Sequence, residues 1–158
     1  MNSHQLSSYK NANYTLQKTK QIVLLYDAAI RFTQQARQAI QEEDYALRFE
    51  LMQKVSNILS GLNASLDFEN GGEISKILSS FYTGLDLRVF NLNRSNNLDE
   101  CDYIVSELKN MRDSWEKIDQ QYGAQVGSSS IAPSQAQEQV VAHQAERISI
   151  AEGADFSA

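Results

Sequence analysis

Apolar residues recur along this chain at every third or fourth position, which is the spacing of one face of an α-helix. Four segments show this pattern, and turn-forming or capping residues separate them. They cover roughly residues 16–41, 45–66, 74–92 and 98–122. Because short connections make consecutive helices antiparallel neighbours, the pattern predicts an all-α protein whose single domain, 16–122, is an up-down-up-down four-helix bundle.

The residues between the segments are typical of helix ends. Asp44 can cap the second helix by accepting a bond from a free backbone amide. Asn70, Gly71 and Gly72 can adopt positive φ, so we predict a sharp turn before the third helix, set by the two glycines. Asn97-Leu98-Asp99-Glu100 resembles a capping box at the start of the fourth helix.

The most informative stretch is the apolar run Ile22-Val23-Leu24-Leu25-Tyr26. Five consecutive helical positions point all the way round a helix, whereas a surface helix buries only one stripe. The first helix therefore needs cover on a second side in addition to the core. Either the N-terminal segment of the chain or a partner protein has to supply it.

The two ends of the chain differ from the bundle segments. Residues 1–15 are polar but carry Tyr9 and Tyr14 at a spacing that fits neither a helix nor a strand. We expect a short helix or arm, either a frayed terminus or a detachable flap that covers the surplus apolar face. Residues 123–158 are rich in Gln, Ala and Ser, and we expect a mostly disordered, flexible tail. A weak helix over 134–150 would carry three apolar residues on one side: Val140, Val141 and Ile148.

Composition and charge restrict the function classes. The 158 residues, 42% hydrophobic and 22% charged, fit one globular domain. A net charge of −6 argues against partners such as nucleic acid or an anionic membrane surface. We expect no signal peptide, because no basic region followed by an apolar run occurs at the N-terminus. No run approaches the roughly 18 apolar residues that argue for a membrane span, so we also expect no membrane insertion. The single cysteine, Cys101, cannot form an internal disulfide, which favours the reducing cytoplasm.

Residue types that carry catalysis or bind metals are scarce. His4 and His143 fall in the terminal segments, so the Glu-x-x-His pairs of a di-metal bundle are missing. Cys101 lies beside Asp102, which raises a thiol pKa, and we expect a buried structural cysteine. Glu42-Glu43-Asp44 fits a capping and turn cluster better than a catalytic dyad. We expect no enzymatic activity, no catalytic residue, no metal site and no cofactor.

Three aromatic residues on the apolar stripes, Trp115, Tyr26 and Tyr82, allow two interpretations. We expect all three in the core, the indole N–H finding a partner or the bundle edge, and the tyrosine hydroxyls near the surface. The alternative for the tyrosines is that they line a groove that accepts a partner's apolar side chains.

Three blocks resemble the FliS family, the flagellin-specific export chaperones of bacterial flagella. Leu25-Tyr26-Asp27-Ala28-Ala29-Ile30-Arg31-Phe32 is similar to its LYDGAIRF block, with Ala28 in place of glycine. Leu66-Asp67-Phe68-Glu69-Asn70-Gly71-Gly72-Glu73-Ile74, followed by Leu78 and Phe81-Tyr82, looks like its LD…GGEI…L..LY block. Met111-Arg112-Asp113-Ser114-Trp115-Glu116-Lys117-Ile118 is similar to its LRDAWE segment. The likeness covers about residues 9–120.

The likeness also extends to the N-terminal segment. Tyr9 and Tyr14-Thr15 fall where the family carries a tyrosine and a Thr-Ala-Ser-Pro stretch. Leu16-Gln17-Lys18 replaces Ala-Ser-Pro here, so the usual helix-start signal is lost.

The resemblance implies a cytosolic antiparallel bundle that binds the C-terminal segment of newly made flagellin. Such a protein keeps flagellin from polymerising early and delivers it to the type III export gate. In this family the N-terminal segment packs over an apolar surface that flagellin also uses. The implied partners are flagellin and the flagellar export gate, with other flagellar regulators or co-chaperones as further candidates, and the chain is expected to be a monomer or weak homodimer.

These considerations give a set of candidate binding residues and a rival function. Tyr9 and Tyr14 are the candidates for the flap. The candidates for the flagellin groove or its rim are Tyr26, Asp27, Ile30 and Tyr82. The competing hypothesis is a structural or regulatory bundle that self-associates through its apolar face.

Overall fold

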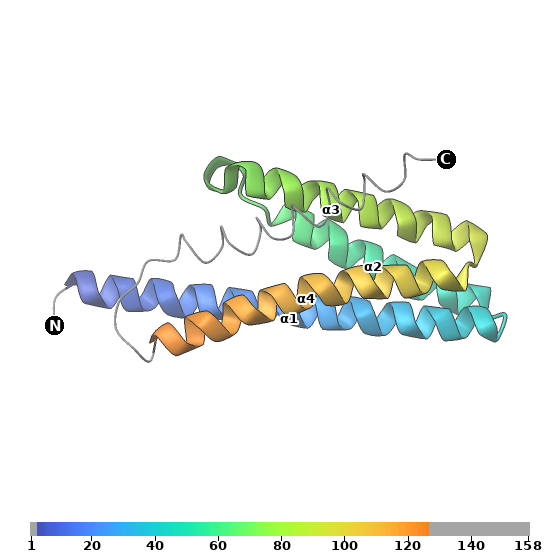
Figure 1. The fold of residues 1–158 in the computed structure, drawn as a ribbon, viewed down its shortest axis with the longest axis horizontal. Coiled ribbons are helices and arrows are strands. Elements are labelled where there is room, and N and C mark those ends of the chain that lie inside the picture. Colours follow the sequence, from blue (N-terminus) through green and yellow to red (C-terminus); the bar gives the residue numbers. More distant parts are fainter. Residues whose placement is uncertain (1–2, 127–158) are drawn as a thin grey trace, which may run out of the picture.

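A computed structural model of the chain describes residues 3–126. The described part is α-helical apart from its short connections and contains no strand. Its helices are α1 (Ser3–Gln41), α2 (Tyr45–Ala64), α3 (Phe68–Ser95) and α4 (Leu98–Val126), drawn in Figure 1. The prediction of an all-α protein with four helices is confirmed for these residues. The expected tail begins later than 123, because α4 continues through Gly123 to Val126, and residues 127–158 lie outside the described part.

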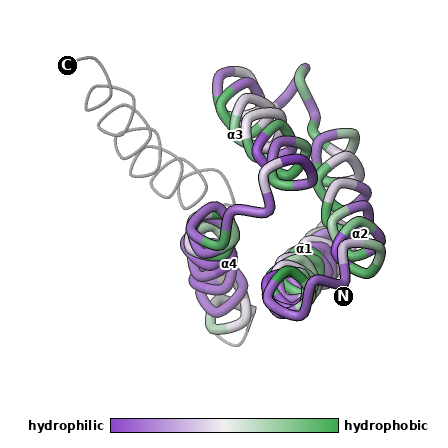
Figure 2. The backbone as a smooth tube through the Cα atoms, turned by 90° about the vertical axis from the view of Figure 1, so that its right-hand side faces the viewer, coloured by the Kyte–Doolittle hydropathy of each residue, from purple (hydrophilic) through white to green (hydrophobic). Residues whose placement is uncertain are grey.

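The helices stand at the four corners of a bundle (Figure 2). α1 packs closely against α2 and α4, and α2 packs against α3, whereas α3 and α4 are the least closely packed neighbours. Three side-chain contacts tie α1 to α4, and their residue numbers rise along one helix while they fall along the other, so these helices are antiparallel. The pairs are Thr19 with Asp119, Asp27 with Arg112, and Arg37 with Asp102.

The N-terminal segment is not the separate arm that we expected over residues 1–15. α1 starts at Ser3 and continues without a break to Gln41. The physical reason is that no glycine or proline occurs before Gly61, so nothing interrupts the hydrogen-bond ladder of the helix. Leu16-Gln17-Lys18, which replaces a helix-start signal of the resembled family, consists of good helix formers and lies inside this helix.

The core is formed by the stripes that the 3.6-residue period predicts. The buried apolar residues form one cluster. Its fully enclosed members include Tyr26, Met52, Leu59, Leu92, Ile104 and Leu108. The stripe positions at the edge of this core are only partly buried, among them Ile22, Leu66, Ile74 and Trp115. One continuous core therefore holds the four helices together.

The turn between α2 and α3 differs in detail from the expected one. Asp67 caps α3, accepting bonds from the backbone amides of Glu69 and Asn70 at 3.0 Å each. Of the residues expected at positive φ, only Gly72 has it (φ 50°), and it kinks the helix after its first turn. Gly71 is helical and matters for another reason: a Cβ there would lie 2.0 Å from the Ser75 hydroxyl oxygen.

The other predicted caps are confirmed in part. Asp44 accepts a bond from the Leu47 amide at 3.0 Å, as expected for the cap of α2. Asn97 accepts a bond from the Asp99 amide at 2.9 Å, but Glu100 does not complete a capping box. Its carboxylate instead pairs with the Arg88 guanidinium at 2.9 Å, which ties α4 to α3.

Candidate protein-binding surface

The N-terminal part of α1 extends beyond the ends of α2 and α3. α1 has 39 residues and α2 has 20, and the two are joined by a tight connection. Because α2 runs antiparallel to α1 from this turn, its far end therefore lies at about the level of Ile22 on α1. In Figure 1 the blue start of α1 projects beyond α2 and α3. Among the four helices only α4 accompanies it, held there by the bond that Thr19 donates to Asp119 at 2.8 Å.

This arrangement leaves part of the apolar run without cover. Tyr26 is completely buried and Ile22 and Val23 are partly buried, but Leu24 remains 65% exposed and Leu25 40% exposed. The prediction that the first helix carries more apolar surface than the described bundle covers is therefore confirmed. Leu25 lies close to the level at which α2 ends, and Leu24 lies on the outer side of α1, among exposed residues such as Lys20 and Arg31.

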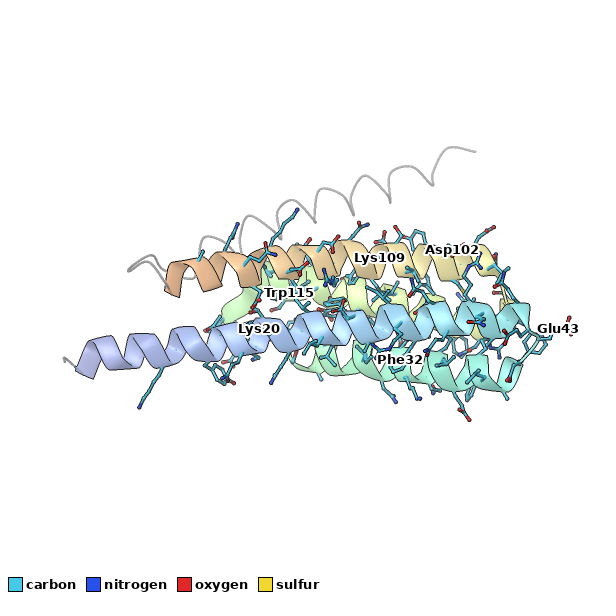
Figure 3. All side chains as sticks on the ribbon, turned by 90° about the horizontal axis from the view of Figure 1, so that it is seen from below. Lys20, Phe32, Glu43, Asp102, Lys109 and Trp115 are labelled. Atoms are coloured by element: carbon cyan, nitrogen blue, oxygen red, sulfur yellow. The ribbon has the colours of Figure 1, made fainter. Side chains whose placement is uncertain are left out.

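Further apolar side chains lie at the same end of the bundle. The turn between α2 and α3 and the second half of α4 are also at this end, away from Glu43 and the α1–α2 turn (Figures 1 and 3). Phe68 in this turn is 55% exposed, and Tyr14 on α1 is 66% exposed. We call the exposed and half-buried set here the open-end surface: Tyr14, Ile22, Leu24, Leu25, Leu66, Phe68, Ile74 and Trp115.

Tyr26 and Tyr82 lie in the core, as expected, and do not line a groove in this structure. Tyr26 is 0% and Tyr82 is 2% exposed, and the Tyr26 hydroxyl donates a hydrogen bond to the Tyr82 hydroxyl at 2.9 Å. The expectation that their hydroxyls lie near the surface was wrong, because each satisfies the other inside the bundle. Burial raises the pKa of both hydroxyls, and that of Tyr26 rises well above its ordinary value. Ile30 is buried beside them in the same core cluster.

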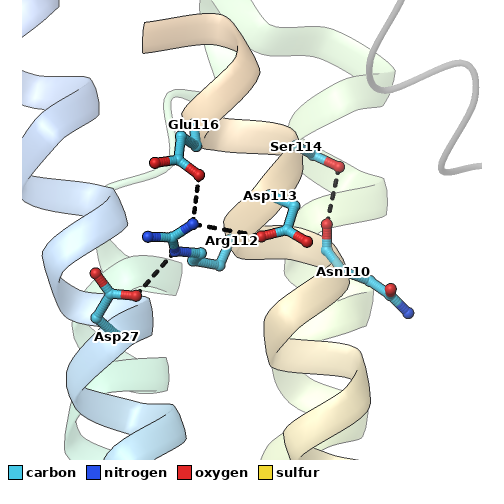
Figure 4. A network of polar contacts seen from close by, with 6 residues as sticks. All are labelled: Asp27, Asn110, Arg112, Asp113, Ser114 and Glu116. Carbon is cyan, nitrogen blue, oxygen red and sulfur yellow. Dashed lines mark hydrogen bonds and ion pairs between the residues drawn. The ribbon is translucent and has the colours of Figure 1, made fainter. Parts of the chain in front are cut away.

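Asp27 belongs to an ion-pair network that joins α1 to α4 (Figure 4). Arg112 donates from Nε to Asp27 Oδ1 at 2.8 Å and also contacts Asp113 and Glu116. The Asp27 and Arg112 side chains are only 39% and 27% exposed. Asp27 therefore holds the middle of α1 against α4.

The two flap candidates are both on α1. Tyr14 is exposed, and the Lys18 ammonium lies 6.0 Å from its ring centroid, within the range of a cation–π interaction. Tyr9 is part of the same helix, but its side chain is outside the described set. In this structure both residues extend the helix that carries the open-end surface, and neither belongs to a separate flap.

Residues 3–126 contain no cluster of three potential metal ligands. Cys101 is fully buried, and burial followed by the neighbouring Asp102 raises the pKa of its thiol to about 11. Its thiolate fraction at neutral pH is negligible, which agrees with a structural cysteine. None of the described helices is long and apolar enough to cross a bilayer.

Sequence reasoning missed a second group of exposed apolar residues on the outer side of α2 and α3. Its members are Tyr45, Phe49, Leu87 and Phe90, between 45% and 60% exposed. A hydrogen bond between Ser56 and Asp86 sets the register of the two helices. Along the helix axes, Phe49 and Phe90 then lie in the same direction from this bond, and their levels differ by about one helical turn or less. The sequence does contain a signal for them: these four apolar residues lie outside the 3.6-residue pattern that predicts the core face of each helix.

Comparison with known proteins identifies a matching family and several similar chains. The model of the flagellar protein FliS family matches residues 1–122. The flagellar secretion chaperone FliS of Campylobacter jejuni is 31% identical over 100 residues, which are 63% of this chain and 77% of that protein. The flagellar secretion chaperone FliS of Salmonella typhimurium is 32% identical over 98 residues, 61% of this chain and 73% of that protein. The Vibrio cholerae protein of the same name is 24% identical over 122 residues, 74% of this chain and 90% of that protein.

Proposed function

This chain belongs to the FliS family of flagellar secretion chaperones, and from that membership we propose that it binds the C-terminal segment of flagellin in the cytosol. By occupying that segment it prevents premature polymerisation, and it then delivers flagellin to the flagellar export apparatus. The open-end surface is the proposed binding site. No nucleotide chemistry in this chain is needed for either step.

The observation that supports this proposal most strongly is the exposed pair Leu24 and Leu25, at the point where α1 outruns α2. Contiguous exposed apolar side chains on a monomer are typical of protein-binding sites. A client helix that lies along α1 beyond the end of α2 would occupy the position that a longer α2 would fill. This is the helix-in-groove mode of recognition, in which apolar anchors repeat every third or fourth residue.

The energetics favour a client that brings a long apolar face. Leu24, Leu25 and Phe68 are already about half buried, so completing their burial contributes roughly 2–5 kcal/mol. Micromolar affinity needs about 8 kcal/mol net, so several further contacts are required. A segment that is disordered before binding can wrap around the bundle and supply them, although its ordering offsets part of the gain.

Calorimetry with purified flagellin tests the proposal. We expect binding to full-length flagellin and none to flagellin that lacks its C-terminal segment; undiminished heat after the truncation would reject that segment as the ligand. Leu24→Asp combined with Leu25→Asp is expected to weaken binding more than tenfold, a loss of about 1.4 kcal/mol. The matched control is Leu87→Asp with Phe90→Asp, two equally exposed apolar residues on the other surface, which should leave the affinity within twofold.

Self-association through the same apolar face remains the competing function, and the exposed surface on α2 and α3 offers a second face for it. Phe49 and Phe90 would be covered in a dimer formed through this face. Light scattering distinguishes the two functions. A stable dimer that is indifferent to flagellin and dissociates on Phe90→Asp supports self-association, whereas a monomer that binds flagellin supports the chaperone.

A further inference from the structure

α2 and α3 lie side by side and turn a common side away from α1 and α4 (Figure 2). Phe49 on α2 is 51% exposed there, and Leu87 and Phe90 on α3 are each 60% exposed. We call these three residues, together with the exposed polar but uncharged residues that continue their rows at helical spacing, the outer face; the polar members are Gln53, Asn57, Ser60 and Thr83. Exposed aromatic residues combined with a lack of charge are typical of the centre of a protein–protein interface.

Two hydrogen bonds show how the helices lie beneath the outer face. Arg48, near the start of α2, donates to Asn96, which follows the end of α3. Ser56, in the middle of α2, donates to Asp86 on α3. Residue numbers therefore rise along α2 as they fall along α3, so the two helices are antiparallel. Positions on them can be compared by counting in opposite directions from the bond between Ser56 and Asp86.

Two opposite charges, Glu50 and Arg94, flank the outer face near its closed end. Counted from the bond between Ser56 and Asp86, they lie about 9 Å and about 12 Å away in the same direction. Phe49, two turns before Ser56, is on the side of α2 that faces α3, whereas Glu50 is 100° further round and lies on the far edge of α2. The two charges are thus on opposite edges of the face, and neither forms an ion pair among the described residues.

We propose that the outer face binds a second copy of this chain about a twofold axis parallel to the helices. α2 of one copy then lies against α3 of the other, and each residue keeps its level along the axis. Phe49 and Phe90 of both copies meet at the axis, and Glu50 of each copy faces Arg94 of the other at levels that differ by about 3 Å. The face is therefore complementary to itself in shape and charge, as a twofold interface requires.

The size of the face indicates how strong the contact is. α2 has 20 residues and is therefore about 30 Å long, and two helices side by side are about 20 Å wide. The face covers roughly 600 Å², or about 1,200 Å² for two copies, which is the lower end of the range for specific complexes. We therefore expect a reversible dimer with a dissociation constant of roughly micromolar order.

This dimer leaves the proposed client site free. The outer face lies over the middle of α2 and α3, whereas the open-end surface is formed by α1, α4 and the α2–α3 turn. Because the axis is parallel to the helices, both open ends point the same way, and one dimer presents two client sites. The association of the two copies does not depend on the proposed function; only this pairing of client sites does.

Sedimentation equilibrium of the full chain tests the dimer. We expect a reversible dimer at concentrations up to about 0.2 mM, well above the expected dissociation constant. Phe90→Asp should weaken it at least tenfold, with unchanged helix content by circular dichroism. The matched control is Leu24→Asp with Leu25→Asp, two exposed residues of the open-end surface, which should leave the dimer within twofold. A monomer at every concentration, or a dimer that the control disrupts and Phe90→Asp does not, overturns the proposal.

Charge exchange tests the arrangement of the two copies. Glu50→Arg alone and Arg94→Glu alone place like charges face to face, and each should weaken the dimer at least threefold. The two changes together restore opposite charges and should return the dissociation constant to within twofold of the unmodified chain. A double variant that is weakened by the product of the single effects overturns the twofold pairing.

Adding the flagellin C-terminal segment separates this proposal from the proposed function. We expect two segments bound per dimer. A chain that binds the segment but never dimerises refutes the dimer and leaves the chaperone function standing. A dimer that passes the tests above but does not bind the segment refutes the chaperone function and leaves the dimer standing.

Discussion

The buried tyrosine pair gives the sharpest test of how this core is built. Tyr26 and Tyr82 come from helices that stand diagonally in the bundle, and their hydroxyls bond at 2.9 Å in the interior. Changing Tyr82 to phenylalanine leaves the Tyr26 hydroxyl without the acceptor for its proton. A buried polar group left in this state costs about 1–3 kcal/mol. We therefore expect Tyr82→Phe to lower the free energy of unfolding by about this amount.

The double variant distinguishes this explanation from a simple loss of packing. Tyr26→Phe with Tyr82→Phe removes both hydroxyls, so neither hydroxyl is left without the other, and only the Trp115 N–H loses a partner. The double variant should be more stable than the sum of the single effects predicts, with a coupling of about 0.5–3 kcal/mol. Tyr26→Phe should be the more costly single change, because Trp115 also hydrogen-bonds to Tyr26.

Urea unfolding followed by circular dichroism measures all three variants. Tyr45→Phe, at a 45% exposed position, is the control and should change stability by less than about 0.5 kcal/mol. Strictly additive effects would refute the pairing of the hydroxyls. The same variants also test the groove interpretation of these tyrosines: once folded, the double variant should bind flagellin as tightly as the unmodified chain, and a large loss of affinity would return them to the binding site.

Three further predictions concern α1, the α2–α3 turn and the buried thiol. Arg112→Ala should cost about 0.5–1 kcal/mol, with a smaller effect in 1 M salt, because its pair with Asp27 is partly exposed and therefore screened; a salt-independent loss in urea unfolding would contradict this. Gly71→Ala should cost about 1–3 kcal/mol in the same assay, because its Cβ would collide with the Ser75 hydroxyl, and the Gly71→Ala, Ser75→Ala double variant should recover most of it. Because the folded pKa of Cys101 is raised from 9.0 to about 11, only the unfolded thiol ionises between these values, so stability should fall from pH 9 to pH 11. Cys101→Ala should flatten that part of the pH profile, and an unchanged profile would be evidence against the buried thiol as its source.

The parts of this fold that sequence predicts are those set by local periodicity and capping. The stripes containing Leu59, Leu92 and Leu108 are buried because a 3.6-residue repeat gives a helix one apolar face whatever it packs against. Asp44 and Gly72 are placed correctly because caps and positive φ are properties of a few neighbouring residues. The surplus of apolar residues at Ile22 to Tyr26 could also be counted without knowing the neighbours.

The incorrect predictions concern contacts between helices and the continuity of α1. The direction of the Tyr26 hydroxyl depends on Tyr82, a partner 56 positions away, and no local pattern specifies such a pair. A break near residue 16 was inferred from the odd spacing of Tyr9 and Tyr14, although Leu16-Gln17-Lys18 offers nothing to stop a helix. The exposed Phe49 and Phe90 were not predicted as a surface, because helical periodicity identifies only the apolar residues that face the core.

Methyl NMR shows directly whether a flagellin terminus binds the open-end surface. Leucine methyl groups are labelled in the full chain, which is then titrated with the flagellin C-terminal segment. We expect the methyl signals of Leu24, Leu25 and Leu66 to shift or broaden in step with binding while those of Leu87 stay in place. Saturable binding that moves the Leu87 signals and leaves Leu24 and Leu25 unchanged would contradict it.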